Sequence, residues 1–253
     1  MITALVRQPA SSLNDCKVTH VDRVPINLGS AFEQFERYCQ VLEHLGVHIE
    51  RLPSLEAFPD SVFIEDNAIV LNELAVLSSM GSFSRQGEPS LLRPVLSPYR
   101  RIVDISLPAT IEGGDVFCIG KTLFVGLSSR TNQGGAESLR AITEPLGYTV
   151  VFVPIAACLH LKTACTPLDD ETLLINPSWI DSEVLKPFRL IPIAPEEPFG
   201  ANVLRVPQGI LAHASCPRTV DLMRNKGYIV KAVDISEFSK AEAGVTCLSL
   251  LIS

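Results

Sequence analysis

The stretch Ser30-Ala31-Phe32-Glu33 begins a pattern that recurs along the chain and decides the fold. Serine followed three residues later by glutamate forms a capping box, and apolar residues then recur at helical spacing until Gly46. These apolar residues are Phe32, Phe35, Cys39 and Leu42. The pattern predicts a helix, and the extended-looking Val47-His48-Ile49-Glu50 predicts a strand directly after it.

A polar loop ending in Phe63-Ile64-Glu65-Asp66 follows, and then the apolar run Ala68-Ile69-Val70-Leu71. The order helix, strand, polar loop, strand recurs four more times. The later strands are expected at Arg101-Ile102-Val103-Asp104, Tyr148-Thr149-Val150-Val151, Arg189-Leu190-Ile191-Pro192 and Tyr228-Ile229-Val230-Lys231, each after a helix-like stretch. Units repeating every 40 to 50 residues or so are typical of a propeller or array.

Five such units fill the chain, so we expect one closed α/β domain over residues 1–253. Two-residue connections at Asn72-Glu73 and Gly120-Lys121 add short hairpins to the units. If the units surround an axis, their polar loops converge on it. The alternative is a generic α/β protein whose loops share no common centre.

Composition describes an ordinary globular protein, with 47% hydrophobic and 19% charged residues and a formal net charge of −7. Since this balance is acidic and the basic residues do not cluster, nucleic acid is not an expected partner. The start of the chain lacks a signal-peptide pattern, and no apolar stretch reaches the ~20 residues that a bilayer requires. We therefore expect a cytoplasmic protein without a membrane partner, its seven cysteines reduced.

Cys247 lies in Ala243-Gly244-Val245-Thr246-Cys247-Leu248-Ser249, near the end of the chain. A lone cysteine is more often core filling than a nucleophile. A catalytic cysteine attacks as the thiolate, which requires a neighbouring cation, a base or a cationic substrate. His160, in a loop between two apolar runs, is the candidate partner, although a lone histidine in such a setting is more often a core residue.

Two loops carry acids in settings that suggest a bound cation. Glu112 precedes two glycines and an aspartate, where the backbone can approach a ligand closely. Asp60, Glu65 and Asp66 stand within seven residues of one another in an apolar segment. Such acids either face water or await a cation, because burying an unpaired carboxylate is costly.

Arg85 and Arg130 stand in loops of small residues, where a planar guanidinium can hold a carboxylate in a bidentate pair. Arginines in loops are usually surface residues. Taken together, the acids, arginines and Cys-His pair fit an amino acid with a guanidinium side chain. Zinc bound by Cys247, His160 and carboxylates is a further alternative, but no local ligand spacing supports it. We expect neither a metal nor a cofactor.

At these residues the chain closely resembles the dimethylarginine dimethylaminohydrolase family of the pentein superfamily. The resemblance runs from Arg7 to the C-terminus. The segments that carry it are Phe58-Pro59-Asp60-Ser61-Val62-Phe63-Ile64-Glu65-Asp66, Ile111-Glu112-Gly113-Gly114-Asp115, Leu159-His160-Leu161-Lys162-Thr163 and Gly244-Val245-Thr246-Cys247-Leu248-Ser249-Leu250. The resemblance implies a five-bladed α/β propeller of ββαβ-type repeats around a central channel, with catalysis that needs no metal.

The resemblance also implies a role for each candidate residue. Cys247 would be the nucleophile, His160 the general acid and base, and Glu112 the carboxylate that binds the guanidinium and supports His160. The further substrate contacts would come from Asp66 at the guanidinium, from Asp60, Arg85 and Arg130 at the amino and carboxylate ends with Glu65 beside them, and from a main-chain carbonyl near Ala241. A lid spanning Asn14 to Asn27 would add a main-chain contact near Val18.

The expected activity is hydrolysis of asymmetric dimethylarginine or monomethylarginine to citrulline and an alkylamine through a covalent thiouronium intermediate. The expected partner is this small substrate, and the protein is expected to be a monomer or homodimer. One alternative is an arginine deiminase-like hydrolase of another guanidino compound, although deiminases of this fold carry additional helical insertions. The other is a pentein that binds without catalysis.

Overall fold

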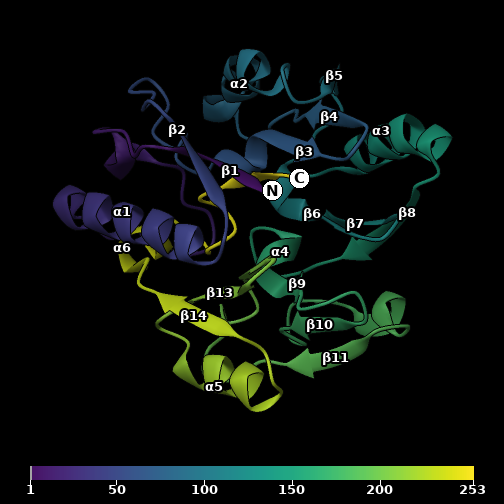
Figure 1. The fold of residues 1–253 in the computed structure, drawn as a ribbon. Coiled ribbons are helices and arrows are strands. Elements are labelled where there is room, and N and C mark those ends of the chain that lie inside the picture. Colours follow the sequence, from purple (N-terminus) through teal and green to yellow (C-terminus); the bar gives the residue numbers. More distant parts are fainter. Residues whose placement is uncertain (1) are drawn as a thin grey trace.

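The computed structural model describes residues 2–253, and over this range fifteen strands form five three-stranded sheets around a common centre (Figure 1). In spatial order the sheets are β15 (Leu250–Ile252), β1 (Thr3–Arg7) and β2 (His48–Leu52); β3 (Ala68–Val70), β4 (Leu74–Leu77) and β5 (Arg101–Asp104); β6 (Val116–Ile119), β7 (Thr122–Leu127) and β8 (Thr149–Pro154); β9 (Cys165–Pro167), β10 (Thr172–Ile175) and β11 (Arg189–Pro192); and β12 (Val203–Val206), β13 (Gly209–His213) and β14 (Val230–Val233). The five predicted repeats and the propeller-like arrangement are confirmed.

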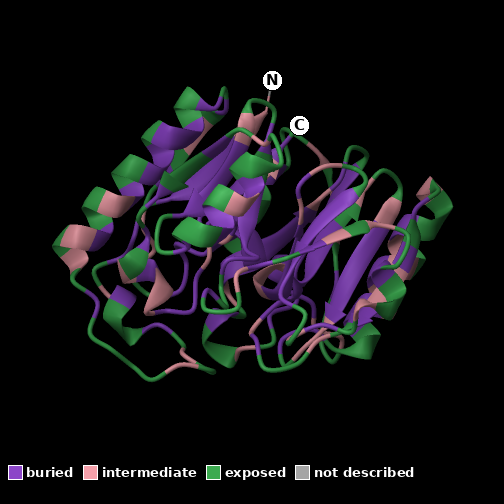
Figure 2. Cartoon of the chain, turned by 90° about the horizontal axis from the view of Figure 1, so that it is seen from below, coloured by how far each residue is buried: buried purple, intermediate pink, exposed green. Residues whose placement is uncertain are grey.

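Each sheet repeats one pairing scheme. Its middle strand pairs antiparallel with one neighbour and parallel with the other, as β4 does with β3 and β5. Parallel neighbours need a crossover, which usually contains a helix. The crossovers contain α1 (Leu28–His44), α2 (Glu88–Leu96), α3 (Gln133–Thr143), the 3-10 turn η6 (Ser182–Leu185) and α5 (Pro217–Asn225). Apart from η6, they are amphipathic helices on the outside of the ring, and their outer faces are exposed (Figure 2).

Two predicted elements differ from the structure. The first helix begins at Leu28 rather than at the predicted capping box, because the Asn27 side chain accepts a hydrogen bond from the Ser30 main-chain N–H and caps the helix three residues earlier. The stretch expected to form a helix before β11 contains only the single turn η6. Pro177 and Pro187 lie on either side of that turn, and proline in a helix interior costs a hydrogen bond.

The ring is closed by the two ends of the chain. β15 pairs antiparallel with β1, with Ala4 opposite Leu251, and the two termini lie side by side (Figure 1). Closure therefore uses residues about 245 positions apart, and it leaves the segment that contains Cys247 directly before β15.

The pairing scheme places all the candidate loops at one end of the ring. The first strand of each sheet is antiparallel to the middle strand and the third is parallel to it. The start of each first strand therefore lies at the same end of the sheet as the ends of the middle and third strands. The loops attached at these points all lie at that end of the ring. These loops contain the short elements η1 (Leu13–Asp15), η2 (Ile64–Asn67), η3 (Phe83–Arg85), η4 (Gly113–Asp115), α4 (Leu161–Ala164) and α6 (Ser236–Ser239); η5 (Glu144–Leu146) extends α3 instead.

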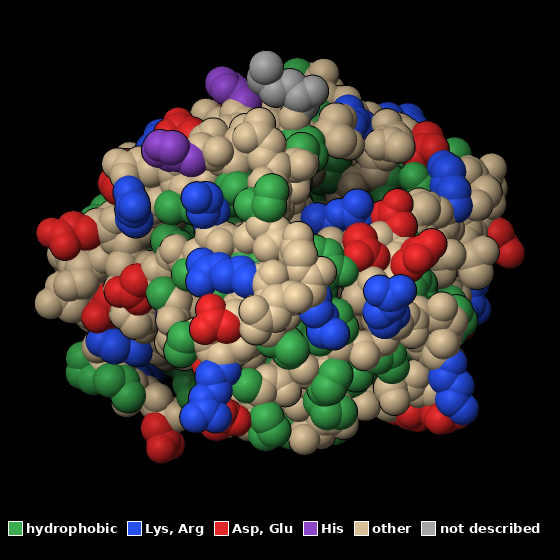
Figure 3. Space-filling view, turned by 60° about the horizontal axis from the view of Figure 1, so that its bottom comes forward, with side chains coloured by type: hydrophobic (Ala, Val, Ile, Leu, Met, Phe, Trp, Pro, Cys, Tyr) green, Lys and Arg blue, Asp and Glu red, His purple; other side chains and the backbone are tan. Residues whose placement is uncertain are grey.

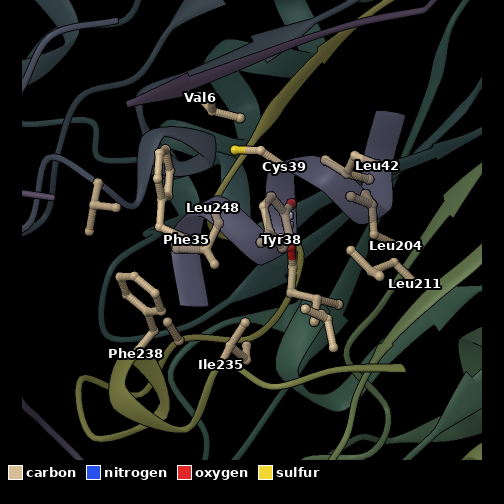
Figure 4. Packing of buried hydrophobic residues seen from close by; sticks show 14 of the residues in the cluster. Val6, Phe35, Tyr38, Cys39, Leu42, Leu204, Leu211, Ile235, Phe238 and Leu248 are labelled. Carbon is tan, nitrogen blue, oxygen red and sulfur yellow. Dashed lines mark hydrogen bonds between the residues drawn. The ribbon is translucent and has the colours of Figure 1, made fainter. Parts of the chain in front are cut away.

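The largest apolar cluster ties the outer helix α1 to the segment that contains Cys247 (Figure 4). Phe35, Tyr38 and Leu42 of α1 are fully buried in it, together with Leu248. The Tyr38 hydroxyl donates to the Val245 carbonyl at 2.8 Å and lies 2.8 Å from Ser249 Oγ. Tyr38 thus holds the chain on both sides of Cys247.

The surface mixes charges of both signs. On the face shown in Figure 3, Lys and Arg side chains alternate with Asp and Glu, separated by small apolar areas. Within residues 2–253 no helix combines the length and the apolar character needed to cross a bilayer.

Candidate active site

A small cavity lies where the loops converge, with a volume of about 20 Å³, enough for one water molecule. Its walls are formed by Lys17, Asp60, Phe63, Asp66, Arg85, Arg130, Leu159, His160, Ala241, Glu242, Ala243 and Cys247. Seven of the nine predicted site residues are among them. Of the other two, Glu112 lies directly behind His160, and Glu65 faces a different space.

His160 and Glu112 form a buried pair. His160 Nε2 lies 2.9 Å from Glu112 Oε2, and the other carboxylate oxygen of Glu112 accepts the Gly81 main-chain N–H at 3.0 Å. Arg130 Nη1 stands 3.5 Å from the same oxygen. Glu112 is completely buried, so these contacts fix its carboxylate and, through it, the imidazole ring.

Asp66 is held on one side only. Its Oδ2 accepts a hydrogen bond from Arg85 Nη1 at 2.6 Å. Its Oδ1 has no hydrogen-bond partner within residues 2–253, although the residue is only 3% exposed and His160 Nδ1 lies 3.8 Å away. A buried carboxylate oxygen left in this state is an acceptor for a ligand with N–H groups.

Arg85 has little hydrogen-bonding capacity left for a ligand. Its Nε and Nη2 donate to the two carboxylate oxygens of Glu88, Nη2 also donates to the Phe63 carbonyl, and Nη1 donates to Asp66. A guanidinium has five N–H donors, so one remains. Arg85 primarily orients Asp66, whereas Arg130 has only long contacts, to Glu112 and to Thr19 Oγ1 at 3.3 Å.

Buried charges set the ionisation of this group of residues. Burial lowers the pKa of His160, but the negative charges of Asp66, Asp115 and Glu112 outweigh it and raise that pKa to about 9. Burial opposes ionisation of Asp66, yet His160 and Arg85 hold the pKa of Asp66 below its ordinary value. At neutral pH the site therefore holds an imidazolium between carboxylates.

Cys247 is half-buried beside these acids. Burial, together with the negative charges of Glu65 and Asp66, raises the pKa of its thiol well above the ordinary value. The empty site thus disfavours the thiolate. A cation bound at Asp66 would reverse part of this effect, because it would offset the same negative charge.

Hydrogen bonds from neighbouring blades fix the Cys247 loop. The Cys247 carbonyl accepts the Glu65 main-chain N–H. Asn202 accepts the Thr246 main-chain N–H at 3.1 Å and donates to the Lys162 carbonyl at 2.9 Å. Asn202 therefore links the loop of Cys247 to the loop of His160.

Two glycines allow the acidic loop to approach its neighbours. A Cβ atom at Gly113 would lie 2.1 Å from the Glu65 carbonyl oxygen. At Gly114 it would lie 2.7 Å from His160 Nδ1 and 2.8 Å from Asp66 Oδ1. Glycine is thus needed at positions 113 and 114 because neighbouring atoms leave no room for a Cβ atom, not because the backbone adopts an unusual angle.

The loop over the cavity, which was expected to form a lid, is tied to the cavity walls. Asp60 accepts the Lys17 main-chain N–H with both oxygens, at 3.0 and 3.2 Å. Glu242 accepts the main-chain N–H groups of Thr19 and His20. A cavity of about 20 Å³ is too small for a substrate the size of arginine, so substrate binding requires this loop to open.

Glu65 lies on the other side of the centre. Its carboxylate pairs with Lys162 Nζ at 2.7 Å and accepts the Thr246 hydroxyl at 2.6 Å. Together with Lys162 it borders a second, larger cavity of about 310 Å³, which also contacts β6, β12 and β15. The structure therefore does not bring Glu65 into the cavity that contains Cys247.

Three contributors to the site were not assigned from the sequence. Glu88 holds Arg85, Asn202 connects two loops, and Glu242 binds the loop over the cavity. Nothing in the spacing of Glu88 or Asn202 along the sequence indicates which residues they bind. Glu242 follows directly after Ala241 and gives no sequence signal beyond being an acid next to a predicted contact.

The residues could also suit a metal ion. Within residues 2–253, Asp66, Glu112 and His160 form one group with ligand atoms within 4.8 Å of one another. Two of those three side chains, however, already contact each other, because His160 Nε2 is hydrogen-bonded to Glu112 Oε2. The free acceptor at Asp66 suits the N–H groups of an organic cation equally well.

Comparison with known sequences gives consistent relatives. The family model for arginine deiminase matches residues 42–197. A dimethylarginine dimethylaminohydrolase of Streptomyces coelicolor is 39% identical, over 98% of this chain and 95% of the relative. One of Pseudomonas aeruginosa is 33% identical over 97% of both chains. An arginine deiminase of Mycobacterium tuberculosis is 32% identical, over 51% of this chain and 35% of its own length.

Solved structures agree with these relatives. A cysteine-to-serine variant of the Pseudomonas aeruginosa enzyme, complexed with citrulline, superposes with a TM-score of 0.94 at 32% identity and covers 99% of this chain and 98% of its own. A dimethylarginine dimethylaminohydrolase adduct with S-methyl-L-thiocitrulline gives 0.95 at 32% identity, with 99% of both chains covered. The N-terminal domain of ArgZ, a cyanobacterial arginine dihydrolase, has the same fold at 20% identity, with a TM-score of 0.90 over 100% of this chain and 98% of that one.

Proposed function

Because the chain belongs to the dimethylarginine dimethylaminohydrolase family, we propose that it hydrolyses N-omega-methylated arginines to citrulline and an alkylamine. The substrates are asymmetric dimethylarginine and monomethylarginine. The five blades act as one catalytic domain, since the ring closes only when β1 and β15 pair.

The observation that carries this proposal is the state of Asp66. One oxygen of its buried carboxylate is fixed by Arg85 and the other has no partner within residues 2–253, in the same cavity as Cys247 and His160. A guanidinium offers that oxygen N–H groups and a compensating positive charge. The group bound there lies next to a thiol, which is the arrangement that amidine hydrolysis requires.

The first chemical step forms a carbon–sulfur bond and breaks a carbon–nitrogen bond. Substrate binding at Asp66 lowers the cost of ionising Cys247. The thiol releases its proton to solvent, and its thiolate attacks the guanidinium carbon. His160 donates a proton to the departing nitrogen, so dimethylamine or methylamine leaves as a neutral molecule. Glu112 keeps the ring of His160 in place for this transfer through its 2.9 Å contact.

The second step uses water. Neutral His160 removes a proton from a water molecule, the oxygen adds to the thiouronium carbon, and the carbon–sulfur bond then breaks. The added hydroxyl passes its remaining proton to the Cys247 thiolate, so citrulline leaves with Cys247 and His160 protonated as at the start. The proton released in the first step is taken up by the free amine in water. Arg130 binds the carboxylate end of the substrate and Asp60 its amino end, with the Ala241 carbonyl nearby. The reaction uses side chains and water, without a metal or cofactor.

The test is a substrate panel with the purified protein. We expect citrulline and dimethylamine in equal amounts from asymmetric dimethylarginine, and citrulline and methylamine from monomethylarginine. Citrulline is quantified by a colorimetric assay and the amines by chromatography. Absence of citrulline from both methylated substrates would exclude the proposed activity.

Unmethylated arginine is the second candidate substrate, because the arginine deiminase family model matches residues 42–197. The same residues would then release ammonia. We expect kcat/KM for arginine to be at least about ten-fold lower than for asymmetric dimethylarginine, measured in the same assay. A preference in the other direction would assign the protein to arginine deimination.

A further inference from the structure

We propose that Glu242 is a positioning residue for the amino-acid end of the substrate, because it holds the loop over the cavity in the closed position. This role rests on the proposed function for its effect on turnover. The contact itself concerns only the loop and Glu242. Neither the repeats nor the conspicuous motifs of the sequence indicate it.

The geometry of Glu242 is that of a two-point clamp. Its Oε2 accepts the Thr19 main-chain N–H at 2.5 Å and its Oε1 accepts the His20 main-chain N–H at 2.6 Å. Both oxygens are thus used on two successive residues of one loop. Charge-assisted hydrogen bonds of this kind are among the strongest that a side chain forms with backbone.

Besides Glu242, this part of the loop is held by Asp60, by Arg130 and by the packing of Val18. Lys17, Thr19 and His20 are exposed, whereas Glu242 is only 8% exposed and lines the cavity. Val18, between Lys17 and Thr19, is partly buried and packs against the largest apolar cluster. The main chain on either side of Val18 is therefore held by hydrogen bonds, and Val18 itself also by apolar packing.

The backbone of Glu242 supports a role for its side chain. Its φ is 63°, in the left-handed region, where glycine is favoured and non-glycine residues other than Asn, Asp and His are uncommon. The residue follows the short helix α6, at a point where glycine would fit with less strain. A glutamate at this position brings its carboxylate under the loop, and such backbone outliers gather at functional sites.

Glu242 differs from Asp60 and Arg130, the other two side chains that contact the loop, in having no role assigned at the substrate. Asp60 and Arg130 also contact the loop, at Lys17 and Thr19, but they are the residues assigned to the amino and carboxylate ends of the substrate. When substrate arrives, those two side chains must exchange loop contacts for substrate contacts. Glu242 has both oxygens on the loop and no assigned contact with substrate, so it can hold the loop again once the loop has closed over bound substrate.

The experiment compares E242Q and E242A with the unaltered protein and with E237A. Glu237 is the matched control, since it also accepts a main-chain N–H at the end of the loop, from Asn27 at 2.8 Å, but lies outside the cavity walls. Three quantities are measured: amide hydrogen exchange at Thr19 and His20, KM and kcat for asymmetric dimethylarginine, and the rate at which 2-chloroacetamidine alkylates Cys247. The last reagent has an amidine but no amino-acid end.

We expect both Glu242 variants to exchange the two amides at least about ten-fold faster and to raise KM about ten-fold, with kcat within about three-fold. Alkylation by 2-chloroacetamidine should stay within about two-fold of the unaltered protein, because the guanidinium end is intact. E237A should leave Thr19 and His20 exchange unchanged. Thermal unfolding of each variant checks that the fold is retained.

Unchanged exchange at Thr19 and His20 in both Glu242 variants would overturn the clamp. Faster exchange with an unchanged KM, or an equal loss of alkylation rate, would overturn the positioning role. Should the unaltered protein fail to turn over any methylarginine, the proposed function fails, while the exchange measurement still decides whether Glu242 holds the loop.

Discussion

The floor and the lid of the cavity are built in opposite ways. The floor consists of Asp66, Arg85, Glu112 and His160, each at most 3% exposed and bonded to another charged side chain. The lid, residues Lys17 to His20, is largely exposed, and the side chains of Asp60 and Glu242 accept hydrogen bonds from its main chain. The floor is fixed before substrate arrives, and the lid can release its contacts one at a time.

This difference suits the two ends of an arginine-like substrate. The chemistry at the guanidinium requires atoms held within fractions of an ångström, which buried charge pairs provide. The amino-acid end must enter and leave, which exposed hydrogen bonds permit. Changes to the floor should consequently reduce kcat, and changes to the lid should mainly raise KM.

The largest expected effect comes from the nucleophile. Cys247→Ser should reduce kcat for asymmetric dimethylarginine by at least about a thousand-fold, because a hydroxyl is a far weaker nucleophile than a thiolate at neutral pH. Citrulline release measures the loss, and urea unfolding should show an unchanged fold. The matched control is Cys118→Ser, an exposed cysteine on β6 that is not among the walls of the cavity. Residual turnover near that of the control would transfer the chemistry to another residue.

The next effect tests how tightly the floor is packed. In Gly114→Ala the new Cβ would stand 2.7 Å from His160 Nδ1, so the imidazole has to move and kcat should fall about a hundred-fold. KM should change little, since the lid is untouched. Gly134→Ala in α3 is the control, as its Cβ would meet nothing closer than 3.4 Å. Equal kcat in the two alanine variants would show that the floor tolerates displacement of His160.

The contrast between floor and lid also separates what the sequence predicted from what it did not. The repeats predicted the five blades, and the grouping of glycine with acids around Glu112 predicted the floor. Both signals are local. Glu242, which accepts hydrogen bonds from Thr19 and His20, is more than 220 positions away from them. The groups that it binds are main-chain N–H groups, which every residue except proline possesses.

Two features of the structure differ from the sequence-based expectation for a local reason that the sequence does not display. Glu65 and Asp66 are adjacent, and the motif suggested that both face the substrate. On the 3-10 turn η2, with three residues per turn, neighbouring side chains point about 120° apart, so Glu65 turns to Lys162 while Asp66 faces the cavity. The cap of helix α1 lies three residues before the start of the predicted capping box because Asn27, also a good capping residue, accepts the hydrogen bond from Ser30.

The charge pairing of the floor predicts a pH dependence of stability. The pKa of His160 is about 9 in the folded protein, above its ordinary value of 6.5. The stabilisation from its proton is therefore complete below pH 6.5 and is lost as the pH rises through about 9. The unfolding free energy of the unaltered protein should therefore fall by about 2 kcal/mol more between pH 6.5 and 8.5 than that of the His160→Gln variant. Urea unfolding of both proteins at the two pH values measures this difference. An identical decrease in both proteins would show that His160 is neutral in the fold.

The smallest effect is expected at the edge of the lid. Arg23 donates to the main-chain carbonyls of Asn14 and Cys16, both at 2.6 Å, and its side chain is exposed. Because exposed contacts contribute little, Arg23→Ala should raise KM only about two-fold and leave kcat and the pH dependence of stability unchanged. Steady-state kinetics would reveal this. A kcat loss as large as that of Gly114→Ala would mean that lid and floor form one rigid unit, and the contrast between them would fail.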